Sequence, residues 1–333
     1  MTAEARLEME VAPASRRKLA GSAAIILQVV IAVGIFAIGS LLVPGFGSGS
    51  SVQAMAVLAS FLGIAALGQT MVVLIGGIDL SVPALIGAGN VMAAKLTGDG
   101  VPWPLTLLLV IVVGVLVGGI NGYITHRWTV PPLVVTLATA SVVGGLVLLW
   151  TNARLTGSAP DWLTQATSPA TSTGPIPLAP VVFVWLLLSV LCAALLRWTK
   201  LGRQLYAIGV NRSAARLMLV SERRVCLVAF GASGMLASLA GFFLAGFTGG
   251  GLFNVGDPYL FLAIAAVVVG GTSLIGGRGG PLRTVVGSIV LIELTTLLVG
   301  FHLQSAAQQA ILGVVIVVVV ALYGRERKIG DRI

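Results

Sequence analysis

Residues 19–43 read LAGSAAIILQVVIAVGIFAIGSLLV, a stretch of 25 residues without a charged side chain. As a helix it would extend about 38 Å, more than the roughly 30 Å of a bilayer's hydrocarbon core. A cleaved signal peptide usually has a shorter apolar stretch, of roughly 7–15 residues, followed by a cleavage site of small residues. We therefore interpret residues 19–43 as an uncleaved first transmembrane helix.

The rest of the chain is similarly apolar. Hydrophobic residues make up 57% of the 333 residues and charged residues 9%, against about 25% charged residues in a typical soluble domain. The mean hydropathy is +1.05. A soluble protein of this length would lack the charges to cover its surface. The composition therefore predicts that lipid is the solvent for most of that surface.

Nine further apolar stretches follow the first one. They predict an all-α membrane protein, a polytopic bundle of about ten transmembrane helices that forms a single domain over residues 19–324. The longest outer connection, about 152–178, is rich in Thr, Ser and Pro and has too little apolar content for a domain of its own. The ten helices are expected near 20–43, 52–75, 81–96, 103–125, 130–151, 179–198, 225–247, 258–275, 282–300 and 304–323.

Lys and Arg residues are distributed unevenly between the connections. Eighteen of the twenty fall before the first predicted helix, after the last, or in or within two residues of every second connection, and only Lys95 and Arg154 lie elsewhere. Segments rich in Lys and Arg stay on the cytoplasmic side of a membrane. The distribution predicts cytoplasmic tails over 1–18 and 325–333. It also explains the net charge of +9 without a nucleic-acid partner.

The sequence offers no motif for catalysis, metal binding or ATP binding. Cys192 and Cys226 belong to no CxxC pair, and neither His126 nor His302 has a partner at metal-binding spacing. The Gly-rich segment 270–280 superficially resembles a phosphate-binding loop, but Gly-Lys-Ser and Gly-Lys-Thr are absent from the chain. We expect no catalytic residue, no metal and no cofactor in this chain.

Charges within the predicted helices are rare. Only Glu293 is clearly inside a span, and Asp79 follows the second one. Glu293 is either a proton site of an ion-coupled carrier or a polar contact that faces the bundle, and we favour the contact. Few buried charges and no ATP site together favour a passive pore that is driven by a partner.

We interpret most of the 43 glycines as residues that allow helices to pack closely or the chain to turn. Some of them lie within predicted helices at helical spacing, such as Gly114, Gly118 and Gly119, or Gly231 and Gly234. Small residues at this spacing favour close packing of helices in lipid. Residues 72–80 and 267–274 also resemble each other weakly, because in both an apolar helix is followed by a glycine pair. Internal repeats of this kind are common in transporters.

Three blocks of sequence resemble a known family. They are GGIDLSV at 76–82, GRQLYAIGVN at 202–211 with AARL at 214–217, and AAVVVGGTSL at 265–274 with GGRG at 276–279. The chain from about residue 50 onward is similar to the permease subunits of bacterial ABC importers for monosaccharides, of the ribose/xylose/arabinose type. Permeases of the same superfamily for branched-chain amino acids or nucleosides are the alternatives, and an ion-coupled carrier is a more distant one.

This resemblance implies a division of labour in the bacterial cytoplasmic (inner) membrane. Two permease copies would form the channel, a cytoplasmic ABC ATPase would drive it, and an extracytoplasmic sugar-binding protein would deliver the substrate. The resemblance makes about 199–224 a cytoplasmic coupling loop for the ATPase. It identifies Gly76, Gly77, Asp79, Ser81, Gly270 and Gly271 as structural motif residues. The residues expected to couple to the ATPase are Gly209, Asn211, Ala214, Ala215 and Arg216.

The chain departs from the family pattern at two places. Residues 218–222 replace a stretch of small residues within the expected coupling loop, and Pro83 stands where Gly is usual. Proline is tolerated in the first turn of a helix because the N–H group there lacks an intrahelical partner.

A sugar pathway needs polar groups whose hydrogen bonds can be exchanged. Four uncharged polar side chains in or beside the predicted helices are candidates for lining it, and each could instead join helices through hydrogen bonds. Asp79 and Ser81 are expected at the cytoplasmic end, where they would cap the following helix. The four pathway candidates are Gln69, Asn90, Asn121 and Thr136.

Overall fold

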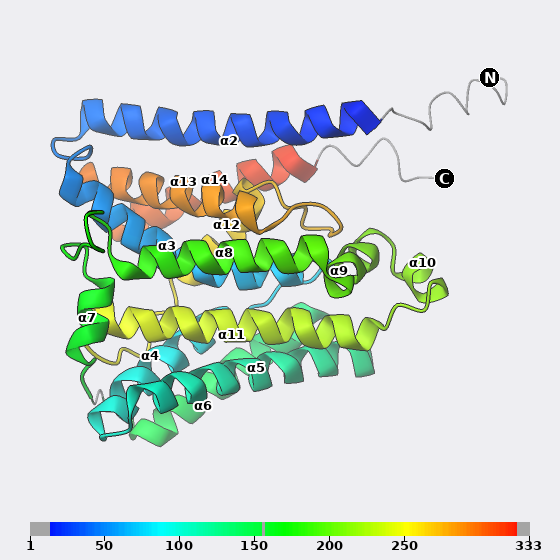
Figure 1. Cartoon of the computed structure of the whole chain (residues 1–333), viewed down its shortest axis with the longest axis horizontal. Helices are drawn as coiled ribbons and strands as arrows, with labels where there is room; N and C mark the ends of the chain where they lie inside the picture. The colour runs from blue at the N-terminus through cyan, green and yellow to red at the C-terminus, as the bar shows by residue number, and fades with distance from the viewer. Residues whose placement is uncertain (1–13, 155–156, 325–333) are drawn as a thin grey trace.

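The computed structural model describes residues 14–154 and 157–324 as a bundle of helices, with no strand among these residues (Figure 1). The predicted tails 1–18 and 325–333 lie outside the described residues, except that residues 14–18 begin the first helix. The helices are α2 (Ala14–Leu42), α3 (Gly49–Leu74), α4 (Val82–Gly98), α5 (Trp103–Trp128), α6 (Pro132–Thr151), α7 (Asp161–Thr167), α8 (Pro180–Trp198), α9 (Lys200–Val210), α10 (Arg212–Leu217), α11 (Glu222–Thr248), α12 (Tyr259–Val269), α13 (Pro281–Gly300) and α14 (Ser305–Gly324).

A helix lies at each of the ten ranges that hydropathy predicted, but they differ in their ability to cross a bilayer. Among the described residues, six helices are long and apolar enough to do so: α3, α5, α6, α8, α11 and α13. Shorter apolar segments lie in α2, α12 and α14. The all-helical membrane architecture is therefore confirmed, while the number of crossings stays a prediction.

Two helices form the centre of the bundle. Nearly all of α3 from Ser60 onward is buried, and α11 packs most extensively against α5, α4 and α3. By contrast, α5, α6 and α8 expose rows of Leu and Val side chains. Such side chains gain nothing from burial when the solvent is lipid, so the exposed apolar rows mark the outer surface of the bundle.

Glycines hold α5 tightly against α11. A Cβ atom at Gly118 would lie 2.1 Å from the carbonyl oxygen of Phe230, and one at Gly114 would lie 2.5 Å from that of Gly234. Only hydrogen atoms fit in this space, so the two backbones approach each other as the glycine spacing predicted. A Cβ atom at Gly119, by contrast, would meet no neighbouring atom within 4 Å.

Two predicted segments differ from the structure. The helix expected over 258–275 ends at Val269, because Gly270 and Gly271 follow it and Gly271 has a positive φ of 74°. Residues 270–280 form a glycine-rich loop instead. The outer connection about 152–178, which was expected to be a loop, contains the short helix α7.

Helices α9 and α10 project together at one end of the bundle, and α7 lies at the opposite end (Figure 1). The end with α9 and α10 also holds the basic last turns of α5 and α8, the first turn of α11 and the 270–280 loop. We call it the basic end. The start of α2 and the end of α14 point toward it (Figure 1).

Candidate functional site: a junction at the basic end

The three blocks that resemble the family meet at the basic end. The N–H of Gly277, in the 270–280 loop, donates a hydrogen bond to the carbonyl oxygen of Leu74, the last residue of α3 (2.9 Å). Gly209 of α9 lies against both of these residues. Segments separated by some 70 to 200 residues in the chain therefore share one contact, which we call the junction.

Gly209 leaves no room for a side chain at the junction. A Cβ atom there would lie 1.9 Å from Leu74 O and 2.4 Å from Gly277 N, well inside any real contact. Gly276 has a positive φ of 94°, and its Cβ would lie 2.9 Å from Gly76 N. The absence of side chains thus lets three backbones touch.

The local sequence explains why α9 and α10 form here. Thr199 accepts a hydrogen bond from Gly202 N–H (3.1 Å) and Asn211 Oδ1 accepts one from Ala214 N–H (3.0 Å), so each helix has a side-chain N-cap. Leu205 and Ile208, three residues apart, bury one face of α9 against the end of α3. Burying each of these side chains stabilises the docked segment by about 1.5–3 kcal/mol, as an upper estimate.

Charged contacts bind α10 to its neighbours. Arg216 Nη2 lies 2.7 Å from Glu222 Oε2, and Arg212 Nη1 lies 3.3 Å from Glu222 Oε1. Arg212 also donates to the carbonyl oxygen of Ile75, just past α3 (3.2 Å). Glu222 thus holds two arginines, and one of them satisfies a terminal carbonyl of the central helix.

The outer tip of this segment is apolar and exposed. Leu217, Met218 and Leu219 are 86%, 78% and 93% exposed. Two of the predicted coupling residues, Gly209 and Ala215, face the bundle, and their role in coupling stays a prediction. The segment therefore has an inner face that packs on α3 and an outer tip that is available to a partner.

Tyr206 links α9 to the start of α13. Its hydroxyl donates a hydrogen bond to the carbonyl oxygen of Gly279 (2.8 Å). Burial raises the pKa of the Tyr206 hydroxyl, and the positive charge of Arg283 opposes this shift. The hydroxyl thus keeps the proton that it donates to the loop.

The junction leads into a buried polar cluster. Residues 75–81 run back from Leu74 into the bundle, where Oδ1 of Asp79 accepts hydrogen bonds from the N–H (2.9 Å) and the hydroxyl of Ser81. Asn121 of α5 donates to Ser81 Oγ (3.1 Å) and accepts from Thr139 of α6 (2.6 Å). The loop after α3 is therefore fastened to α5 and α6.

The depth of this cluster corrects a prediction. Asp79 and Ser81 were expected at the cytoplasmic end, but their neighbours lie well inside the bundle. The Ser233 hydroxyl lies near the Asp79 carboxyl, and Ser233 is eleven residues beyond the start of α11, a distance of about 17 Å. Neither Asp79 Oδ2 nor Ser233 Oγ has a hydrogen-bond partner of good geometry. Ser81 occupies the N-cap position of α4 without the expected side-chain capping bond.

The four predicted pathway residues are all buried and hydrogen-bonded within the chain. With its amide oriented to suit its neighbours, Gln69 donates to Asp79 O (3.1 Å) and accepts from Asp79 N–H (3.2 Å). Thr136 accepts from Leu80 N–H (2.9 Å), and Asn90 accepts from Leu252 N–H (2.7 Å). Asn121 belongs to the cluster with Asp79. In this conformation the four side chains join helices and loops, and a role in lining the pathway stays a prediction.

No cluster of metal-ligating side chains occurs in the part of the chain that the structure describes. Glu293, within α13, is buried, and its Oε2 has no hydrogen-bond partner. Gly270 packs against Arg283 O at the start of α13, so the second glycine pair also lies where backbones approach closely.

Sequence reasoning missed Tyr206 and Glu222. Glu222 had a visible signal, because it is the only acidic residue among seven basic ones between residues 197 and 224. Tyr206 lies within the 202–211 block, but its contact had no signal in the sequence, since its partner Gly279 is 73 residues away.

Comparison with known proteins identifies the family. Residues 51–320 match the family described as "Branched-chain amino acid transport system / permease component". The ribose import permease protein of Haemophilus influenzae is 32% identical over 86% of this chain and 88% of its own length. Autoinducer 2 import system permease proteins of Klebsiella pneumoniae and an Enterobacter strain are 35% and 33% identical, over 79% of this chain and 75% and 76% of theirs. No solved structure matches the chain.

These relatives are transport permeases rather than enzymes. With its several apolar helices, the chain is a multi-pass protein of the bacterial inner membrane. The family match runs from the first turn of α3 into α14 and includes the junction and the buried polar cluster. This chain belongs to the branched-chain amino acid transport system permease component family.

Proposed function

We propose that this chain is the permease subunit of an ATP-driven ABC importer that carries a monosaccharide, of the pentose or hexose type, across the cytoplasmic membrane. The observation that carries the proposal is the seating of α9 and α10 on the end of α3, with an exposed apolar tip beyond them. The chain has no ATP-binding motif, and α9 and α10 are suited to receive force from a separate ATPase subunit.

We infer the proposed substrate class from the names of the relatives. One imports ribose and others import autoinducer 2, according to their names. A polar solute of this size suits a pathway with few charges, and Glu293 is the one carboxyl group in the middle of a candidate span among the described residues.

The proposal assigns the basic end to the cytoplasm, where an ABC ATPase hydrolyses ATP and binds the tip formed by Leu217, Met218 and Leu219. A sugar-binding protein docks at the opposite end. Because the four polar candidates are enclosed within one chain, we assign the pathway to a face that is completed by a second copy of this permease.

Reconstitution in vesicles tests the proposal. We expect the full chain alone to accumulate no ribose, and the full chain with its cognate ATPase and binding protein to accumulate ribose or a related sugar when ATP is inside. Leucine and adenosine, offered in parallel, separate the rival substrate classes. Concentrative uptake by the chain alone, or uptake of leucine in place of any sugar, would contradict the assignment.

A substitution at Glu293 distinguishes this proposal from an ion-coupled carrier. We expect Glu293→Gln, which keeps the shape of the side chain, to retain uptake within about twofold, because a packing contact is preserved. A carrier that moves protons through this carboxyl would lose nearly all activity, since the amide exchanges no proton. The measurement is the initial uptake rate with and without a proton gradient. Loss of uptake together with loss of gradient dependence would favour the carrier.

A further inference from the structure

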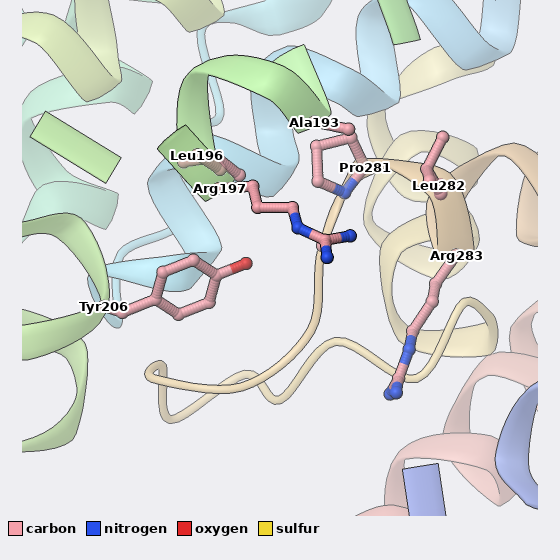
Figure 2. Close-up of a pocket in the computed structure, with 8 residues that line it drawn as sticks. Ala193, Leu196, Arg197, Tyr206, Pro281, Leu282 and Arg283 are labelled. Atoms are coloured by element: carbon pink, nitrogen blue, oxygen red, sulfur yellow. The ribbon is translucent and has the colours of Figure 1, made fainter. Parts of the chain in front are cut away.

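A pocket of about 390 Å³ lies at the basic end, beside the junction. The end of α8 provides Ala193, Leu196 and Arg197, α9 provides Tyr206, and the first turn of α13 closes the other side. Figure 2 shows the Arg197 guanidinium and the Tyr206 ring directed into this space, while the Arg283 side chain extends away from them. The proposed function leaves this pocket without a role.

The polar part of the pocket is suited to an anion. Arg197 is exposed and forms no ion pair with another residue that the structure describes. The positive charge of Arg283 acts on the neighbouring Tyr206. In addition, α13 begins at the pocket without a side-chain cap, so the positive end of its dipole adds to the charge of Arg197.

An exposed apolar stripe on α8 extends from the pocket away from the basic end. One stripe of α8 consists of residues that follow each other at intervals of three or four, namely Leu186, Val190, Ala193 and Arg197. Leu186 and Val190 are exposed. Trp198, next to Arg197, is also exposed, and exposed tryptophans are typical of the membrane–water interface. An occupant of the pocket would therefore meet charge at the interface and an apolar surface beneath it.

We propose that this pocket binds an anionic phospholipid. Its phosphate lies beside Arg197 and the start of α13, and one acyl chain follows Leu186 and Val190. Basic pockets between helices on the cytoplasmic side are known lipid headgroup sites in membrane proteins. Because the pocket joins α8, α9 and α13, the lipid would hold the start of the coupling loop (about 199–224) against the bundle.

The test is to measure the retention of phosphatidylglycerol by the purified, delipidated full chain, using native mass spectrometry with phosphatidylcholine as the neutral reference. We expect one phosphatidylglycerol to bind at least about fivefold more tightly than phosphatidylcholine. Arg197→Gln should remove about this fivefold preference, since one interfacial arginine contributes that much. Arg224→Gln, which removes an exposed charge from the same end outside the pocket, should leave the preference unchanged.

Arg197→Lys controls for misfolding, because it keeps the charge and should retain most of the preference. Equal losses in Arg197→Gln and Arg224→Gln would overturn the proposal in favour of diffuse surface charge. Displacement of phosphatidylglycerol by millimolar inorganic phosphate would assign the pocket to a free anion instead of a lipid. Weaker co-purification of the ATPase with Arg197→Gln, with lipid retention unchanged, would assign it to the protein partner.

Discussion

We expect Gly209→Ala to lower ATP-driven sugar uptake about tenfold or more, and Gly209→Val to abolish it. The added methyl group would lie 1.9 Å from the carbonyl oxygen of Leu74, so α9 must move away from the end of α3. Overpacking of this kind costs about 1–3 kcal/mol, and each 1.4 kcal/mol corresponds to a factor of ten. Alanine otherwise favours a helix over glycine by about 1 kcal/mol, so a loss of uptake would come from the contact.

Two measurements separate force transmission from partner binding. The ATPase should still co-purify with Gly209→Ala, because the exposed tip at Leu217 to Leu219 is unchanged. The control is Gly231→Ala, the same substitution in α11, where the nearest atom would lie 3.6 Å from the new methyl group. Full uptake by Gly209→Val would show that the junction transmits no force. Loss of ATPase binding would instead make Gly209 part of the docking surface.

The positions of the helices follow from hydropathy because lipid selects long apolar segments whatever their neighbours. The helix predicted over 258–275 ends earlier than predicted, at Val269, and the cause is local. Residues 267–269 are apolar and continue the helical pattern, while the glycines after them adopt backbone angles that the pattern does not reveal. Residue composition alone cannot tell a glycine that packs a helix from one that ends it.

The depth of Asp79 could not be predicted for a different reason. Residues 75–81 are seven in number, and an extended chain of that length spans about 23 Å, enough to reach the middle of a bilayer. Nothing in the sequence says whether such a segment lies along the membrane surface or turns inward. Its partners Asn121 and Ser233 are 40 and more residues away, and only the folded helices bring them together.

Only part of the candidate site could be predicted from the sequence. The three blocks were recognised from the sequence, but Asn211 was expected only as a residue that couples to the ATPase, and its capping of α10 was not predicted. Their convergence on Leu74, however, depends on how the ends of α3, α9 and the 270–280 loop are packed. Gly209 faces the bundle, which the sequence did not reveal, and its role in coupling to the ATPase stays a prediction.

The largest effect on stability is expected at Gly118. Leucine there would place its Cβ 2.1 Å from the carbonyl oxygen of Phe230, in the contact between α5 and the central helix α11. Backbones cannot yield as side-chain ends can, so we expect a cost of about 3 kcal/mol or more. This should lower the melting temperature in detergent by about 6–12 °C, or prevent accumulation of the folded chain.

Gly119→Leu is a matched control one position along the same helix. No atom lies within 4 Å of a Cβ at Gly119, so the same change should shift the melting temperature by less than about 2 °C. Thermal unfolding followed by fluorescence of the detergent-solubilised chain compares the two variants, with Gly118→Ala as an intermediate step. If both leucine variants melt together, helix propensity rather than the α5–α11 contact controls stability. A large difference would mean that the glycine spacing, visible in the sequence, determines how closely the central helix can be packed.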